Sequence, residues 1–383
     1  MNAIFQISRL LCLVASLVLS SIPASAALSK EIVVGSVVPL SGPLATLGKP
    51  LAEGASACFD MVNSNGGVNG YQIRFEIRDD RFDPKATVAQ THELIAANNP
   101  IAMINSAGSQ QNIALVQSGV LQRANIALVG PRDGSATLRE LKSPNLYFLI
   151  ASIGAEADKM VRVSATIGRK RLALVYSDDG DGRDALKQVE RAAKDKGSTL
   201  VARYAVPANA KVIPDIAKKI ADDGTLQQVL VYGVTPMVAE FYKDVRKLNP
   251  AMPVTAFSVT SHAAIVDLLG RQASRGLMLA QVTLPTSSAL QVMKDFRDAM
   301  DLEQIPEIRI NNLHLEGYLA ARVVVEAIKR IHGTPSREGL IAALDHLNKE
   351  NIGGLTFDFS DGKREGSAFV QIGIIGPQGK LMN

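Results

Sequence analysis

The stretch Ile32-Val-Val-Gly-Ser-Val-Val-Pro-Leu-Ser-Gly-Pro43 decides the fold class of this chain. Its first seven residues are rich in β-branched side chains and predict a strand, and the Ser-Gly-Pro at its end predicts a loop. A helix is predicted from about Leu47 to Gly66-Gly67, because glycine can adopt the left-handed conformation common at helix C-termini. A strand, a loop and a helix in this order form the first unit of an α/β sheet.

The same alternation continues along the chain. Asp83 and Pro84 predict a helix start, since aspartate caps helix N-termini and proline fits the first helical position. Further strands are predicted at 71–78, 101–104, 126–129, 171–176, 199–205, 228–232, 254–257 and 277–282. Helices are predicted between them at 110–123, 135–141, 155–167, 183–196, 212–222 and 236–248. Because a second series begins after Tyr147, we expect two doubly wound lobes with parallel sheets and helices on both faces.

The C-terminal part departs from this pattern. Three helices, near 287–301, 311–332 and 336–348, are predicted to follow one another. After them, the segments Leu355–Phe359 and Ala368–Ile375 flank a turn at Asp361-Gly362 and predict an antiparallel hairpin.

Length and composition exclude several classes of protein. The 383 residues correspond to two domains or one large one, at about 100–200 residues per domain. Apolar residues make up 47% and charged residues 20%, which excludes a disordered chain. The 41 basic and 37 acidic residues give a net charge of +4, but they are scattered, so nucleic-acid binding is not expected. Aromatic residues are only 5%, without tryptophan, which disfavours a site that stacks a carbohydrate or flat ring.

The N-terminal residues 1–26 have the pattern of a secretory signal peptide. An apolar run at 10–19 follows Arg9, and Ala24-Ser25-Ala26 predicts cleavage after Ala26. The alternative is an uncleaved anchor. No later segment is a continuous apolar run of spanning length, so we expect an exported protein that is not embedded in the membrane. The mature chain keeps one cysteine, Cys58, which cannot form an intrachain disulfide and is predicted to lie in the core.

The motifs of catalysis and cofactor binding do not match this chain. Gly180-Asp-Gly-Arg-Asp-Ala185 has dinucleotide-binding spacing, but the aspartates that crowd it would repel a pyrophosphate. Gly42–Lys49 resembles a phosphate-binding loop, but its spacing is one residue too long and Pro50 replaces the required Ser or Thr. The five histidines form no metal-binding spacing, and there is no G-x-S-x-G nucleophile motif. We therefore expect no enzyme activity, no cofactor and no metal.

An ordered set of short motifs resembles a known family. These motifs are 32–43, Val62-Asn-Ser-Asn-Gly-Gly-Val-Asn-Gly70, Arg78-Asp-Asp80 with Asp83-Pro84, Leu172–Gly182, Leu315-Glu-Gly-Tyr318 and Ile352-Gly-Gly-Leu-Thr-Phe357. Together they are similar to the branched-chain amino-acid binding proteins of bacterial ABC importers, the Leu/Ile/Val-binding type. The resemblance implies a type I periplasmic binding protein with a ligand cleft between two Rossmann-like lobes joined by three crossovers. It implies lobe 1 at 27–148 plus 281–353, and lobe 2 at 149–280 plus 354–383.

The resemblance also implies a binding site and partners. Residues Ala107, Gly108 and Ser109 match a loop that offers backbone amides and a hydroxyl to a ligand carboxylate. The other implied ligand-binding residues are Arg132, Asp133 and Gly134 in a second carboxylate-contacting loop, Asp181 in the acidic loop, and Thr260 and Ser261. The implied partners are a small-molecule ligand and an inner-membrane ABC permease, and we expect a monomer. A ligand-sensing receptor of the same fold and an exported hydrolase are the alternatives.

Departures from the family pattern bear on the ligand. Leu47, Ile153 and Asp181 stand where the family usually has aromatic residues. The segment Ser258-Val-Thr-Ser261 contains no carboxylate where the family has the acidic partner of an ammonium group. We therefore expect a small carboxylate-bearing ligand, such as an amino acid, an amide or an organic acid. An anion anchored by Arg132 is favoured over an α-amino acid, because an unpaired buried charge is costly.

Overall fold

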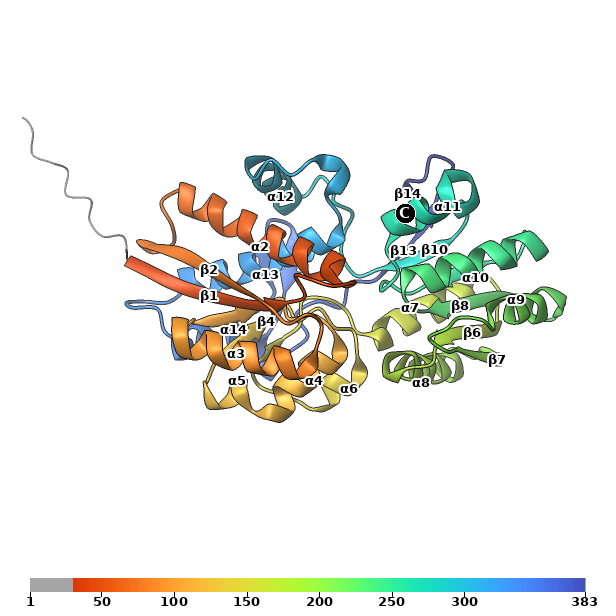
Figure 1. Ribbon diagram of the computed structural model, residues 1–383, viewed down its shortest axis with the longest axis horizontal. Coiled ribbons are helices and arrows are strands. Elements are labelled where there is room, and N and C mark those ends of the chain that lie inside the picture. The colour runs from red at the N-terminus through yellow and green to blue at the C-terminus, as the bar shows by residue number, and fades with distance from the viewer. Residues whose placement is uncertain (1–29, 383) are drawn as a thin grey trace, which may run out of the picture.

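The computed structural model of the protein describes residues 30–382, so the predicted signal peptide and its cleavage site lie outside the described residues. Figure 1 shows two α/β lobes side by side along the long axis of the molecule. Each lobe has its own sheet, as the two strand–helix series predict.

The first lobe contains a parallel sheet of five strands in the order β2-β1-β3-β4-β5. These strands are β1 (Lys30–Val38), β2 (Tyr71–Asp79), β3 (Ala102–Ile104), β4 (Ala127–Val129) and β5 (Leu146–Tyr147). One face packs against α2 (Ala45–Ser64), α12 (Gln291–Leu302), α13 (Asn312–Lys329) and α14 (Arg337–Asp345). The other face packs against α3 (Pro84–Asn98), α4 (Ser109–Ser118), α5 (Val120–Arg123) and α6 (Ala136–Glu140). Cys58 is buried in the core on the α2 side, as predicted.

The second lobe contains seven strands in the order β14-β13-β10-β9-β8-β6-β7. They are β6 (Arg171–Ser177), β7 (Thr199–Val206), β8 (Gln228–Tyr232), β9 (Val254–Ala256), β10 (Met278–Gln281), β13 (Gln371–Ile375) and β14 (Leu381–Met382). Helices α7 (Ile153–Thr166) and α8 (Gly180–Asp195) cover one face. Helices α9 (Ile213–Asp222), α10 (Thr235–Leu248) and α11 (His262–Ser274) cover the other.

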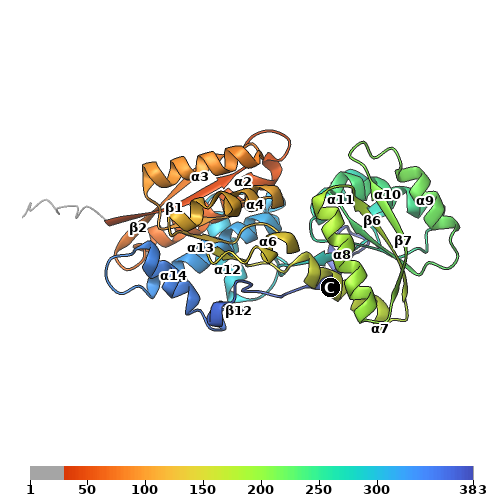
Figure 2. The same ribbon diagram turned by 90° about the horizontal axis from the view of Figure 1, so that it is seen from below.

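The chain crosses between the lobes three times: after β5, after β10, and between β12 (Leu355–Phe357) and β13. Figure 2 shows these connections as the narrow part of the molecule between the two lobes. The first and third crossovers are joined to each other, because the Phe148 amide donates to the Arg364 carbonyl at 2.8 Å and the Gly366 amide donates to the Phe148 carbonyl at 2.8 Å.

Two sequence-based expectations differ from the structure. The predicted hairpin of 355–359 and 368–375 is wrong: β12 pairs with β11 (Glu350–Ile352), and β13 pairs antiparallel with β10. Both strands exist, but their partners lie on opposite sides of a crossover. The single helix predicted at 110–123 is divided at Gly119, whose φ of 68° is left-handed and ends α4.

Candidate ligand-binding site

The loops after β3 and β4 lie together at the carboxyl edge of the first sheet. Ala107 and Arg132 form a parallel bridge between them. The Arg132 amide donates to the Ser106 carbonyl at 2.7 Å, and the Gly108 amide donates to the Arg132 carbonyl at 3.3 Å. The two loops that the sequence singles out are therefore one paired structure, at the edge where open α/β sheets bind ligands.

Gly108 sets the direction in which α4 begins. Its φ is 101°, and a Cβ on it would lie 2.2 Å from Oε1 of Gln111, so another residue would be strained here. Ser109 follows as the first residue of α4. The first amides of a helix have no partner within it, and the helix dipole favours an anion beside them.

Ser109 faces a carboxylate of the opposite lobe. Its hydroxyl donates to Oδ2 of Asp181 at 2.9 Å, and Oδ1 of Asp133 lies 3.2 Å from the same hydroxyl. Asp133 belongs to the loop after β4, and its Oδ1 also accepts the Ser135 amide at 2.6 Å. Three residues predicted for the site, from three separate loops, thus meet at one point between the lobes.

A second contact joins the lobes beside this point. Oδ2 of Asp184 in α8 accepts the amide of Ala136, the first residue of α6, at 2.7 Å. Gly182 makes the start of α8 compact, because a Cβ there would lie 1.8 Å from the Ser177 carbonyl oxygen. The side chain of Asp179 caps α8 and accepts the Gly182 amide at 2.8 Å. The acidic segment is therefore a helix N-terminus that points at the first lobe.

The carboxyl groups of Asp133 and Asp181 at this interface have raised pKa values because they are buried. Burial raises the pKa of Asp181 to about 6, a shift opposed by the hydrogen bond from Ser109 and reinforced by the charge of Asp133. Burial also raises the pKa of Asp133, whose side chain is 2% exposed. Burial is the main cause of both shifts, and for Asp181 the charges of neighbouring aspartates add to it.

Arg132 precedes Asp133 in the loop after β4 and lies among carboxylates. Its Nε is 3.3 Å from Oε2 of Glu316, a residue of α13 that is 8% exposed. Glu156 in α7 accepts the Ser258 amide at 2.8 Å and the Ser258 hydroxyl at 2.9 Å. Burial raises the pKa of Glu156 to about 7, while Ser258 and the positive charge of Arg132 lower it. A carboxylate therefore does stand against the 258–261 loop, but α7 supplies it.

The remaining predicted residues make contacts apart from the Ser109–Asp181 contact. The Gly134 carbonyl accepts the Ile153 amide at 2.7 Å, which fixes the start of α7 against the first lobe. The Thr260 hydroxyl donates to the Gly233 carbonyl at 3.2 Å. Ser261 caps α11, and its hydroxyl accepts the Ala264 amide at 3.3 Å. The hydrogen bonds of Thr260 and Ser261 thus stay within the second lobe.

Three residues whose charges or side chains act on the predicted site residues escaped the sequence analysis: Glu156, Glu316 and Tyr232. Tyr232 ends β8, and its pKa is raised well above the ordinary value by burial and by the charges of Asp181 and Glu156. Its place at the carboxyl end of a parallel strand was a usable signal, since ligands bind at such edges. Glu316 lies within a motif quoted for the resemblance, but nothing local places it beside Arg132.

The histidines give no support to a hydrolase. Within residues 30–382, the hydrogen bonds of histidine rings go to carbonyl oxygens, to Glu53 and to Asn311, and none goes to a serine or cysteine. A nucleophile and its base would need to lie within hydrogen-bond reach.

Comparison with known proteins gives the same fold and family. A model of the periplasmic binding protein family matches residues 31–371. The chain belongs to the periplasmic binding protein family. A Leu/Ile/Val-binding protein homologue from Brucella melitensis is 24% identical, over 96% of this chain and 94% of its own. The family consists of substrate-binding proteins rather than enzymes, and no helix within residues 30–382 is long and apolar enough to cross a membrane.

Solved structures match this periplasmic binding protein over most of its length. A substrate-binding periplasmic protein from Ralstonia solanacearum superposes with a TM-score of 0.82 at 31% identity, covering 92% of this chain and 99% of its own. An extracellular ligand-binding receptor from Verminephrobacter eiseniae gives 0.84 at 30% identity, with coverage of 92% and 100%. A Thermus thermophilus branched-chain amino acid ABC transporter protein with bound valine, at 18% identity, shares the fold with a TM-score of 0.81, covering 92% and 95%.

Proposed function

We propose that this periplasmic binding protein captures a small carboxylate-bearing ligand between its lobes and delivers it to an ABC importer. The observation that carries the proposal is the contact of Ser109 with the carboxylate of Asp181 at 2.9 Å. A ligand carboxylate in the same place would accept the Ser109 hydroxyl and the first amides of α4, and the helix dipole would favour it. Asp181 thus occupies a carboxylate position that a ligand can take over.

We further propose that the ligand also carries an ammonium group. Glu156 brings a carboxylate to Ser258, at the loop where the sequence has none. Three more carboxylates, Asp133, Asp181 and Glu316, lie near this loop, whereas the guanidinium groups whose charges act on these carboxylates within residues 30–382 are those of Arg132 and Arg139. A positively charged ligand group would reduce the cost of burying the carboxylates. This favours an α-amino acid over the purely anionic ligand that the sequence suggests.

Arg132 has a different role in this proposal from the one the sequence suggests. Its Nε faces Glu316 at 3.3 Å, and its charge acts on Glu156. We therefore assign the ligand carboxylate to Ser109 and the α4 amides, and we assign Arg132 to balancing Glu316 and Glu156. Ala107, Gly108 and Gly134 shape the loops, and Thr260 and Ser261 form the far wall.

The two-lobed architecture is suited to delivery. A hinged protein can close around a ligand, and a partner can then recognise the closed form. We propose that export removes residues 1–26, that the mature protein acts in the periplasm as a monomer, and that a permease complex is its partner. We propose lobe boundaries at 148/149 and 280/281, since Phe148 takes part in the pairing of the first and third crossovers. The third boundary lies after β12 rather than at 353/354, because β12 pairs with β11 and Phe357 and Phe359 pack in the core of the first lobe.

A thermal-shift screen tests the ligand class. The mature protein is heated with each of the proteinogenic amino acids, and with amides and organic acids of similar size. A ligand present at about 100 times its Kd stabilises the protein by about 2.7 kcal/mol. We expect at least one amino acid to raise Tm. The best amino acid is then compared by calorimetry with its analogue lacking the amino group, which we expect to bind more than about tenfold more weakly. Equal affinities would contradict the ammonium assignment, and no Tm rise with any carboxylate would contradict the ligand class.

A further inference from the structure

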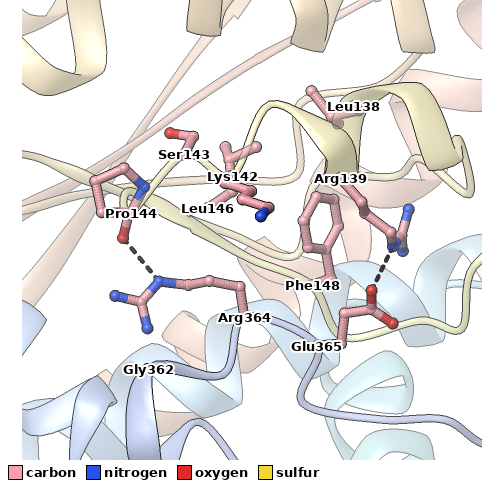
Figure 3. Close-up of a pocket in the computed structure, with 10 residues that line it drawn as sticks. All are labelled: Leu138, Arg139, Lys142, Ser143, Pro144, Leu146, Phe148, Gly362, Arg364 and Glu365. Carbon is pink, nitrogen blue, oxygen red and sulfur yellow. Dashed lines mark hydrogen bonds and ion pairs between the residues drawn. The ribbon is translucent and has the colours of Figure 1, made fainter.

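A pocket of about 350 Å³ lies in the first lobe, between residues 138–148 and residues 362–365 of the third crossover. None of the residues predicted for the ligand site lines it. We call it the hinge pocket. Its lining residues are Leu138, Arg139, Lys142, Ser143, Pro144, Leu146, Phe148, Gly362, Arg364 and Glu365, drawn in Figure 3. The volume falls within the range of small-molecule sites, about 300–1,000 Å³.

Two parts of the chain build the walls of the hinge pocket. One is the segment from α6 to β5, and the other is the third crossover, which the Phe148–Arg364 backbone bond holds against it at 2.8 Å. The Arg364 guanidinium is fixed in place: its Nε donates to the Pro144 carbonyl at 2.9 Å, and its Nη1 lies 3.0 Å from Asp345. It also lies 4.7 Å from the centre of the Tyr147 ring. The wall that Arg364 forms is therefore held in place by its hydrogen bond to Pro144 and its ion pair with Asp345.

The charges of the lining are mostly positive. Arg139, Lys142 and Arg364 are cationic, and Glu365 is the one carboxylate among the lining residues. Glu365 lies 3.4 Å from Nε of Arg139 and Asp345 pairs with Arg364, but in the part of the chain that the structure describes no carboxylate pairs with Lys142. Figure 3 shows the Lys142 ammonium directed toward the middle of the lining side chains. One flexible cation thus remains for an anion from outside.

The floor of the hinge pocket is apolar. Leu138, Leu146 and Phe148 are buried, with 0%, 1% and 3% exposure. The guanidinium of Arg139 stacks 4.0 Å from the centre of the Phe148 ring, and it donates to the carbonyls of Asp133, Ser135 and Ile150. These bonds hold the Arg139 guanidinium over the ring of Phe148, below the cationic rim. Because the floor side chains are almost fully covered, an apolar ligand body would contact Pro144, an exposed apolar residue of the lining, while its charged group reaches Lys142.

We propose that the hinge pocket is a second small-molecule site, distinct from the cleft, that binds an anion with a compact apolar body, as aromatic carboxylates have. Lys142 forms the ion pair with the anionic group, Arg364 adds a fixed positive charge, and Pro144 contacts the apolar body. Because the ligand touches the first lobe and the third crossover at once, it binds where the lobes are joined.

The test uses benzoate as the probe and benzamide as its neutral, nearly isosteric control. Both are titrated into the mature protein while amide NMR shifts are followed. We expect benzoate to shift the amides of 138–148 and 362–365, and benzamide to bind at least about tenfold more weakly, as the loss of a charge-assisted hydrogen bond predicts. We expect Lys142→Met to weaken benzoate binding by a similar factor. Lys218→Met, which removes an exposed lysine of α9, is the matched control and should leave the titration unchanged.

Each outcome decides the proposal. Lys142 is exposed, so Lys142→Met should fold like the wild type, which a melting curve verifies. The proposal is overturned if benzoate shifts only amides around 105–109, if benzamide binds equally well, or if Lys142→Met binds like the wild type. Ser109→Ala separates the two sites, because a shift at 138–148 that persists in this variant comes from the hinge pocket alone.

Discussion

The hydroxyl of Ser109 lies 2.9 Å from Oδ2 of Asp181, so one hydrogen bond joins the first turn of α4 in the first lobe to the first turn of α8 in the second. Two helix N-termini therefore converge on the same point of the cleft. Their dipoles both favour negative charge there, but Asp133 and Asp181 place two carboxylates close to the same hydroxyl. The contact is consequently sensitive both to protons and to a ligand.

Acid should favour the arrangement of the ligand-free protein in which the Ser109–Asp181 contact joins the two lobes. Burial raises the pKa of Asp181 from 3.8 to about 6, and the neighbouring charges of Asp133, Asp179 and Asp184 act in the same direction. The raised pKa of Asp181 stabilises the folded arrangement fully at pH values below 3.8, the pKa of the exposed carboxyl. This stabilisation is lost as the pH rises through about 6. Small-angle X-ray scattering should therefore give a smaller radius of gyration at about pH 5 than at about pH 8.

Two variants test whether Asp181 causes the change of the radius of gyration with pH. Asp181→Asn should reduce the difference between the two pH values, and Asp178→Asn, which changes an exposed aspartate of the same segment, should keep it. A radius that does not change with pH in the wild type would show that Asp181 does not govern closure.

Glu156→Gln should separate recognition of the ammonium group from overall stability. The pKa of Glu156 is raised to about 7 by burial, so a neutral amide suits its surroundings and should cost little stability. The affinity for the amino acid found by screening should fall by about tenfold or more, as for a lost charged hydrogen bond, while its des-amino analogue is affected less. Calorimetry checks this, with exposed Glu240→Gln as the control. An equal loss for both ligands would mean that Glu156 only shapes the loop.

His314 should make the first lobe less stable in mild acid. The pKa of His314 lies below its ordinary 6.5 because burial disfavours the imidazolium, although Glu53 accepts a hydrogen bond at 3.0 Å. In the unfolded chain the His314 imidazole is protonated near pH 6.5, whereas in the folded chain it is protonated only at lower pH. The contribution of His314 to the free energy of unfolding is therefore complete above pH 6.5 and decreases below it. Denaturant unfolding at about pH 8 and about pH 5 should show this loss, reduced in His314→Gln but not in His346→Gln. The same loss in both variants would assign it elsewhere.

Gly317→Ala should destabilise the first lobe, because α13 and α2 approach closely at this residue. A Cβ on Gly317 would lie 2.0 Å from the Leu51 carbonyl oxygen, so the helices would have to separate. Overpacking of this kind costs about 1–3 kcal/mol. Gly339→Ala in α14 is the control, since its nearest neighbour is a side-chain methyl group at 3.3 Å. Equal unfolding free energies for the two variants would show that the helices can adjust.

The local elements could be predicted from sequence because their signals are local. Asp83 and Pro84 predicted the start of α3, and Asp83 does cap it by accepting the Ala86 amide at 2.8 Å. The partner of β13 could not be predicted in this way. Its antiparallel partner β10 ends at Gln281, far from Gln371 in sequence, whereas a hairpin was the nearest local choice.

The candidate site shows the same division. Ser109 and Asp133 follow the ends of β3 and β4, so their convergence could be expected from the topology of a parallel sheet. Glu156 could not be identified, since it lies 102 residues from Ser258 and only the packing of α7 against the second sheet brings them together. A missing carboxylate in a loop therefore does not show that the folded site lacks one.

Calorimetry on Ser109→Ala is the most direct test of ligand capture between the lobes. Wild type and variant are titrated with the amino acid that gives the largest rise in Tm, and their melting curves are recorded without ligand. Loss of the hydroxyl should weaken binding by about 10- to 100-fold, as expected for a hydrogen bond to a charged group, and leave the melting curve nearly unchanged. Unchanged affinity in the variant would contradict the account, because the ligand would then bind elsewhere.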